Sequence, residues 1–101
     1  MNLPINQQTV LITGAGRGLG SAISKSFHRE GAKVIINYRK SFEDAKRLSD
    51  SLGDNAILIK GDIRIKEEVM QMRKDLLDQK ISINTVIHNA INDYKFNGEQ
   101  R

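Results

Sequence analysis

Short apolar runs alternate along this chain with segments in which apolar residues recur every three or four positions. The runs are rich in β-branched residues and read continuously, as strands do when helices cover both of their faces. The four predicted strands are 9–13, Lys33–Tyr38, Ala56–Lys60 and 84–88. The spacing between them predicts three amphipathic helices, over 19–30, Phe42–Leu52 and 65–79.

Each predicted helix carries an apolar stripe that is expected to face the sheet. The stripes are Leu19, Ala22, Ile23 and Phe27; Phe42, Ala45, Leu48 and Leu52; and Ile65, Val69, Met72 and Leu76. Strands that alternate with helices imply an α/β fold with a parallel sheet and right-handed crossovers. We therefore expect part of a three-layer α/β/α sandwich with strand order 3-2-1-4, whose ligand crevice lies at the carboxyl ends of the central strands.

Composition narrows the range of functions. A chain of 101 residues fits one domain, and the absence of cysteine excludes thiol catalysis, disulfides and zinc–cysteine sites. No apolar run is long enough to cross a membrane, so no membrane partner is expected. The net charge of +4 is spread along the chain without interleaved aromatic residues, which argues against nucleic acid as a partner. The two histidines are far apart and no spacing suggests a metal site.

The segment after the first predicted strand is unusually rich in glycine. Residues 13–20 read TGAGRGLG. Gly14 lets the chain leave the strand sharply, Gly18 lets backbone N–H groups approach a pyrophosphate, and Gly20 lets the helix pack closely on the sheet. The phosphates would then lie at the positive end of the helix that starts near Leu19. Because this turn joins a strand to a helix, it predicts a Rossmann-type dinucleotide-binding domain over residues 1–101.

Three motifs together resemble the short-chain dehydrogenase/reductase family. Thr13, Gly14, Gly18 and Gly20 match the cofactor fingerprint of that family, Thr-Gly-x-x-x-Gly-x-Gly. Gly61-Asp62-Ile63 is similar to its Asp-Val/Ile motif, in which the Asp contacts the adenine amino group. The resemblance extends over nearly the whole chain, from about residue 9 to residue 92.

The third motif is His88-Asn89-Ala90, which resembles the Asn-Asn-Ala-Gly motif of the family. The resemblance implies that Asn89 ties the central strands together and that the Ala90 backbone lies near the adenosine ribose. His88 replaces the first Asn and Ile91 replaces the glycine, which puts the approach to the ribose in doubt. The local sequence is most similar to 3-oxoacyl-acyl-carrier-protein reductases, which implies a cytoplasmic oxidoreductase of fatty acid biosynthesis.

The end of the second predicted strand bears on the choice of cofactor. NAD-binding proteins place an acidic residue there to hold the ribose 2′-OH, whereas Asn37 is followed here by Tyr38, Arg39 and Lys40. Arg39 could bind a 2′-phosphate, Ser41 could donate to it, and Arg17 could approach from the glycine turn. The pattern therefore predicts that NADP(H) is preferred over NAD(H).

The catalytic group of the family is absent from this chain. The family uses Tyr-x-x-x-Lys as its proton donor, but Tyr38 is followed four residues later by Phe42, and Tyr94 by Gly98. We therefore expect an N-terminal fragment that holds the adenosine-binding half and is inactive alone. Two alternatives stay open: a nucleotide-binding module without catalysis, and an interaction protein that has kept only the fold.

The last predicted strand and the residues after it suggest self-association. Residues 93–101 read as a polar tail, so the strand at 84–88 would be an unprotected edge. Val86 and Ile87 would lie beside that edge without a covering helix. The chain is therefore expected to associate with itself through this edge.

Overall fold

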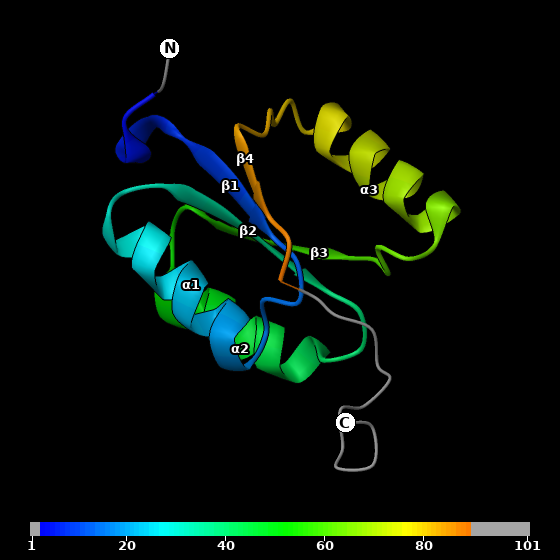
Figure 1. Ribbon diagram of the computed structural model, residues 1–101, viewed down its shortest axis with the longest axis horizontal. Helices are drawn as coiled ribbons and strands as arrows, with labels where there is room; N and C mark the ends of the chain where they lie inside the picture. The colour runs from blue at the N-terminus through cyan, green and yellow to red at the C-terminus, as the bar shows by residue number, and fades with distance from the viewer. Residues whose placement is uncertain (1–2, 90–101) are drawn as a thin grey trace, which may run out of the picture.

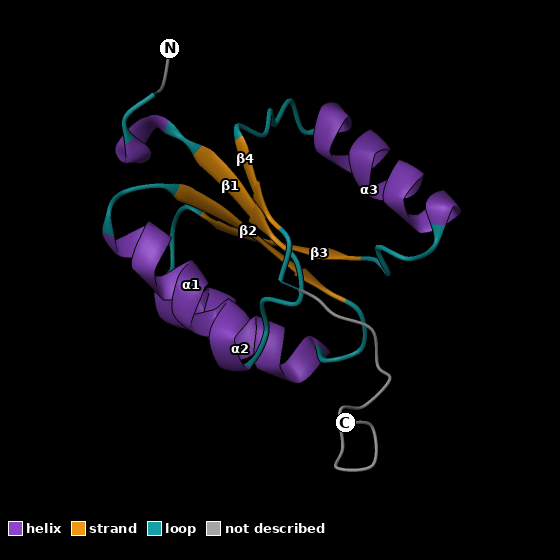
Figure 2. Ribbon diagram, viewed as in Figure 1, coloured by secondary structure: helices purple, strands orange, loops and turns teal. Residues whose placement is uncertain are grey.

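The computed structural model describes residues 3–89, which form a four-stranded sheet with helices on both faces (Figures 1 and 2). Strands and helices alternate after one short 3-10 helix that the sequence analysis did not predict. The elements are η1 (Ile5–Gln7), β1 (Thr9–Ile12), α1 (Gly18–Arg29), β2 (Lys33–Tyr38), α2 (Phe42–Leu52), β3 (Ala56–Lys60), α3 (Lys66–Asp78) and β4 (Thr85–Ile87). The predicted strands and helices are all present, with bounds that differ by at most one residue at either end.

The sheet is parallel and its strand order is β3-β2-β1-β4, as predicted. The register aligns Leu11 of β1 with Ile35 of β2 on one side and with Val86 of β4 on the other. Parallel strands bring their carboxyl ends to one edge of the sheet. The turns that follow β1, β2 and β3 and the residues that follow β4 therefore lie close together, at the edge where such sheets bind ligands.

Alternate residues along the strands point to opposite faces of the sheet, and both faces are apolar. Figure 1 shows α1 and α2 on one face and α3 on the other. The buried residues on the α1–α2 face are Val10, Ile12, Ala15, Ala32, Val34, Ile36, Ala45 and Leu48. Those on the α3 face are Leu11, Ile35, Ile59, Met72 and Leu76. The continuous apolar runs of β1 and β2 thus arise because these strands are covered on both sides.

Five residues of the predicted stripes are exposed, and here the stripe prediction was wrong. They are Leu19, Ala22, Phe42, Ile65 and Val69. Leu19 is 69% exposed because it lies in the first turn of α1, where the helix begins at the ligand edge of the sheet. Ile65 directly precedes α3 and Val69 lies near its start, whereas the later residues Met72 and Leu76 make the buried contact. A stripe is buried only where another element lies opposite it.

β4 lies at an edge of the sheet among the described residues. Val86 is 56% exposed, in agreement with the predicted apolar edge. Ile87 differs from the prediction, because it is half-buried against the cluster on the α1–α2 face. Within residues 3–89, none of the helices is both long enough and apolar enough to cross a bilayer.

Candidate functional site

The glycine-rich turn joins β1 to α1 at the ligand edge of the sheet. Gly14 and Gly18 have φ angles of 62° and 57°, in the left-handed region that side chains other than glycine rarely adopt. A Cβ on Gly20 would collide with the carbonyl oxygen of Gly14 and lie 2.8 Å from the Cα of Ala15. The glycines at 14, 18 and 20 are therefore required by the backbone geometry. An α-helix leaves its first N–H groups without partners inside the helix, so α1 presents donors suited to an anion here.

Asn89 ties the end of β4 to the end of β1. Its backbone N–H donates to Thr13 Oγ1 at 2.8 Å, and its Nδ2 donates to the carbonyl oxygen of Gly14 at 3.1 Å. The same Nδ2 lies 2.7 Å from the position that a Cβ on Gly20 would take. Asn89 thus has the strand-joining role that the resemblance implied, and it also explains part of the need for glycine at position 20.

Asn37, at the end of β2, is buried and fixes two turns at once. Its carbonyl oxygen accepts from the N–H of Ala15 at 3.0 Å, which holds the glycine turn. Its Nδ2 donates to the carbonyl oxygens of Ile59 and Gly61, which holds the turn after β3. Because the side chain is only 2% exposed, its contacts organise the site from inside the sheet.

Arg39 follows β2 and borders an open cleft of about 480 Å³. The cleft is lined by three cationic and two aromatic residues, Arg39, Lys40, Lys60, Tyr38 and Phe42. The Arg39 side chain is 35% exposed and therefore within reach of a ligand. Ser41 is half-buried and directly precedes α2, but its side chain makes no capping hydrogen bond to the helix.

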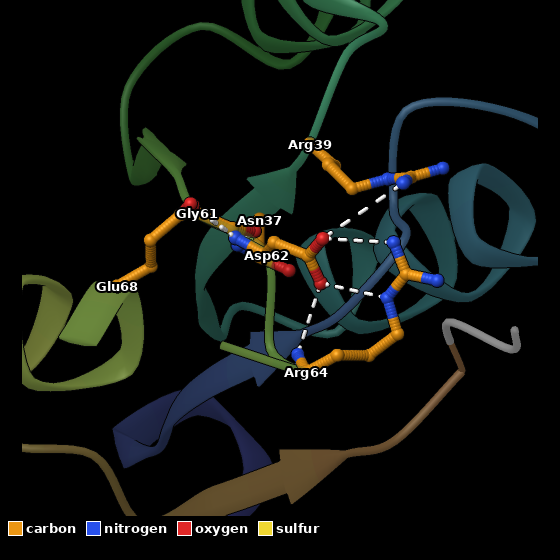
Figure 3. A network of polar contacts seen from close by, with 6 residues as sticks. All are labelled: Asn37, Arg39, Gly61, Asp62, Arg64 and Glu68. Atoms are coloured by element: carbon orange, nitrogen blue, oxygen red, sulfur yellow. Dashed lines mark hydrogen bonds and ion pairs between the residues drawn. The ribbon is translucent and has the colours of Figure 1, made fainter. Parts of the chain in front are cut away.

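Asp62, directly after β3, is the centre of a polar network (Figure 3). Its Oδ1 accepts from the backbone N–H of Arg64 at 2.9 Å and from Arg64 Nε at 3.0 Å, and its Oδ2 accepts from Arg64 NH2 at 2.8 Å. Arg39 NH1 lies 3.8 Å from the same Oδ2. The hydrogen bonds from Arg64 hold the pKa of Asp62 well below its usual range, aided by the charges of both arginines and opposed by partial burial. Asp62 is therefore ionised at neutral pH.

Arg64 and Glu68 belong to this network, and the sequence analysis missed both. Glu68 Oε1 accepts from the backbone N–H of Asp62 at 2.8 Å, which fastens the start of α3 to the turn. Ile63, which lies between Asp62 and Arg64 in the sequence, packs against the cluster on the α3 face. The spacing of Asp62 and Arg64, two residues apart in a turn, permits the Arg64 contact but does not specify it.

Arg17 and Arg39 contact different carboxylates. Arg17 Nε lies 3.5 Å from Asp44 Oδ2, and the Arg17 side chain is 72% exposed. Asp44 also accepts from Arg47 NH1 at 2.9 Å, so the contacts of Arg17 lie on the α2 side of the glycine turn.

Ala90, Ile91, Tyr94 and the tail at 93–101 lie outside the described residues. No group of three His, Asp or Glu side chains in the described chain could hold a metal ion.

Comparison with known proteins gives a family match over most of the chain. The model of the short chain dehydrogenase family matches residues 8–97. A short chain dehydrogenase of Claviceps purpurea is 35% identical over 71 residues, which are 67% of this chain and 27% of that protein. Versicolorin reductase stcU of Emericella nidulans is 33% identical over 92 residues, which are 88% of this chain and 35% of that protein. The chain thus spans about a third of the length of these curated relatives.

Solved structures give the same result for the fold. A 3-ketoacyl-(acyl-carrier-protein) reductase from Brucella melitensis, complexed with NADH, superposes with a TM-score of 0.72 at 28% identity. The match covers 92% of this chain and 40% of that one. A short chain dehydrogenase from Bacillus anthracis has a TM-score of 0.81 at 23% identity, over 96% of this chain and 40% of that one. With the glycine turn, the strand order and the family match in agreement, this chain belongs to the short-chain dehydrogenase family.

Proposed function

We propose that this chain forms the adenosine-binding half of an NADP(H)-dependent oxidoreductase. The observation that carries the proposal is the turn from β1 to α1, where Gly20 has no room for a Cβ and Gly14 and Gly18 have positive φ angles. Such a turn brings backbone N–H groups close to a pyrophosphate at the start of a helix. The cofactor, when bound, would supply the hydride for reduction of a carbonyl group.

The predicted cofactor residues divide by the part of the nucleotide that each would hold. Gly14, Gly18, Leu19 and Gly20 would hold the pyrophosphate through their backbone. Asp62 and Ile63 would contact the adenine, and Asn89 and Ala90 would border the ribose. Asn37 would support the site from within the sheet, since its side chain is buried. Arg17, Arg39 and Ser41 would approach the 2′-phosphate.

Preference for NADP(H) follows from charge at the end of β2. Arg39 is accessible at the cleft, and Lys40 and Lys60 border the same cleft. Asp62, whose carboxylate lies 3.8 Å from Arg39, is already held by Arg64. A 2′-phosphate would therefore meet a positive local potential, whereas a ribose 2′-OH would meet no free carboxylate at the end of β2.

Titration of the 101-residue chain with NADPH and NADH tests this preference. NADPH is expected to bind more tightly, and Arg39→Ala should weaken its binding by about 1–3 kcal/mol, as loss of a charge-assisted hydrogen bond does. Lys46→Ala is the matched control, because Lys46 is paired with Asp50 on the exposed side of α2. Equal dissociation constants for the two cofactors would refute the preference.

We propose that the substrate of the whole protein is a 3-oxoacyl thioester. We also propose that the protein acts in the cytoplasm, in fatty acid biosynthesis. Sequence similarity to 3-oxoacyl-acyl-carrier-protein reductases supports this, as does the structural neighbour from Brucella melitensis at 28% identity. The chain as given contains no Tyr-x-x-x-Lys, so it should bind cofactor without oxidising NADPH in the presence of a 3-oxoacyl substrate. Steady oxidation by the purified chain would contradict that expectation. Binding without turnover is also what a non-catalytic nucleotide-binding module would give, whereas absence of cofactor binding would favour an interaction protein.

Self-association through β4 is the second proposal, and the exposed Val86 at the sheet edge favours it. An unpaired strand edge next to an apolar side chain recruits other strands. Sedimentation at low micromolar concentration should show a dimer or larger species, and Val86→Lys should shift it toward the monomer. Leu77→Lys, at an equally exposed apolar residue of α3, should leave the distribution unchanged. A monomeric unsubstituted chain would refute the proposal.

A further inference from the structure

The Asp62 carboxylate lies close to two guanidinium groups at the carboxyl ends of β2 and β3. Arg64 contacts both oxygens of Asp62 at hydrogen-bond distance, 3.0 and 2.8 Å. Arg39 lies 3.8 Å from one of those oxygens, within the range of an ion pair but beyond a hydrogen bond. Figure 3 shows both guanidinium groups directed toward the Asp62 carboxylate. Arg64 therefore interacts more strongly with Asp62 than Arg39 does.

The relative strength of these two arginine contacts matters because the Asp62 side chain is only 9% exposed. Water screens a carboxylate poorly in such a position, so its charge acts strongly on neighbouring groups. A two-pronged arginine contact offsets most of that charge. Glu68 adds a second carboxylate nearby, but it accepts from the backbone N–H of Asp62, from the α3 side. Without Arg64, Arg39 would be the nearest cation and would be drawn fully onto Asp62.

We propose that Arg64 determines cofactor specificity by compensating Asp62, so that Arg39 can bind a 2′-phosphate. The inference rests on the proposed NADP(H) function and adds a residue to it. Arg64 is a positioning residue, since it acts through Asp62 and Arg39. Removing it would both draw Arg39 onto Asp62 and leave a carboxylate that repels an incoming phosphate. The expected result is a loss of discrimination between nucleotides with and without that phosphate.

The test uses two ligands that fit the adenosine half and differ by one phosphate, adenosine 2′,5′-bisphosphate and 5′-AMP. Their dissociation constants are measured at fixed ionic strength with the 101-residue chain and its variants. Arg64→Gln should lower the affinity ratio of bisphosphate to AMP about tenfold, chiefly through weaker bisphosphate binding. Arg73→Gln removes an equal charge from an exposed position on α3 and should change the ratio less than about twofold.

Two further variants separate positioning from general structure. Arg64→Lys should restore part of the ratio, because lysine keeps the charge but loses the fork that reaches both oxygens. In the Arg39→Gln background, Arg64→Gln should have little further effect on the ratio, because the residue through which it acts is gone. A thermal melt without ligand checks that each variant folds. If Arg64→Gln does not fold, Arg64→Lys carries the test, and an unchanged ratio in it overturns the proposal.

The outcomes separate this inference from the proposed function. A chain that prefers the bisphosphate, and whose Arg64→Gln variant behaves like Arg73→Gln, overturns the role of Arg64 and leaves NADP(H) preference intact. Equal weakening of both ligands by Arg64→Gln also overturns it, because a merely structural residue gives that result. An unsubstituted chain that binds 5′-AMP as tightly as the bisphosphate overturns both proposals.

Discussion

The turn after β1 and the turn after β3 lie at the same edge of the sheet but are held in different ways. The first, at 13–17, is fixed by close backbone packing around Gly20 and by the hydrogen bonds of Asn89. The second, at 61–65, is fixed by charged side chains, with Arg64 on the carboxylate of Asp62 and Glu68 on its backbone N–H. The first turn depends mainly on close packing, and the second mainly on charged side chains.

This difference predicts how each turn responds to change. Close packing is insensitive to pH and salt but tolerates no added atoms. The strength of an ion-paired turn depends instead on the ionisation of the carboxylate. The two turns should therefore fail under different treatments, and the following predictions are arranged to show this.

The largest effect is expected from Gly20→Ala, which attacks the packed turn. The new Cβ would meet backbone atoms of Gly14 and Ala15, which cannot move without displacing the whole turn. We expect the free energy of unfolding to fall by at least about 3 kcal/mol, at the upper end of the usual cost of overpacking. Urea denaturation followed by circular dichroism measures this.

Gly18→Ala is the control for that experiment, since it makes the same change two residues earlier. No atom lies within 4 Å of a Cβ at Gly18, so only the φ angle of 57° opposes it, at a cost of about 1–2 kcal/mol. If Gly20→Ala lost no more stability than Gly18→Ala, close packing at Gly20 would be disproved.

Asn89→Ala should have a smaller effect, because it removes one hydrogen bond of the packed turn and keeps another. The bond from Nδ2 to the Gly14 carbonyl is lost, while the backbone bond to Thr13 stays. The expected loss is about 1–2 kcal/mol in unfolding free energy, because the Gly14 carbonyl is left partly unsatisfied.

Asn84→Ala tests the same kind of contact at the opposite end of β1 and β4. Asn84 Oδ1 accepts from the N–H of Thr9 at 2.8 Å, and this contact is exposed to solvent. Water can replace it, so the loss should be below about 1 kcal/mol. A larger loss from Asn84→Ala than from Asn89→Ala would show that the ligand edge is the less tightly held end of the strand pair.

The smallest effect is expected from the ionisation of Asp62 in the ion-paired turn, because it changes the free energy of unfolding only in acid. Because the pKa of folded Asp62 lies below its ordinary value of about 3.8, the unfolded chain takes up the proton first as pH falls. The stabilisation from Asp62 is thus fully present well above pH 4, and it is lost as the pH drops below about 4 toward the folded pKa. Unfolding free energies between pH 7 and pH 2 should show this part of the acid dependence missing in Asp62→Asn.

Asp50→Asn is the matched control for acid sensitivity, because Asp50 forms an exposed ion pair with Lys46. Its variant should keep nearly the full acid dependence of the unsubstituted chain. The charge-based account of the turn after β3 fails if Asp62→Asn and Asp50→Asn show the same dependence of unfolding free energy on pH. It also fails if Gly20→Ala, rather than Asp62→Asn, changes that dependence.

Sequence reasoning predicted the packed turn better than the ion-paired one. The glycines at 14 and 20 indicated the sharp turn and the close packing of α1 directly, since each position admits few other residues. The parallel sheet and its order also followed from the sequence, because continuous β-branched runs such as Lys33–Tyr38 occur where both faces are covered.

The contacts of Arg64 could not be predicted in the same way. A long side chain near a turn can adopt many rotamers, and its partner is decided by atoms that the fold brings together. Periodicity failed at Ile65 and Val69 for a related reason, because a stripe indicates only which residues share a side of the helix. Whether that side is buried depends on what lies opposite.

The pairing of β4 with β1 also has a consequence for the order of folding. The contacts between Thr9 and Asn84 join residues 75 positions apart, whereas β1 and β2 pair within a single strand–helix–strand unit. The entropy lost on closing a loop grows with its length, and the three residues of β4 give little pairing in return. β4 should therefore dock last and detach first. Since Asn89 reaches the glycine turn only when β4 is docked, the motif nearest the start of the chain is completed at the end of folding.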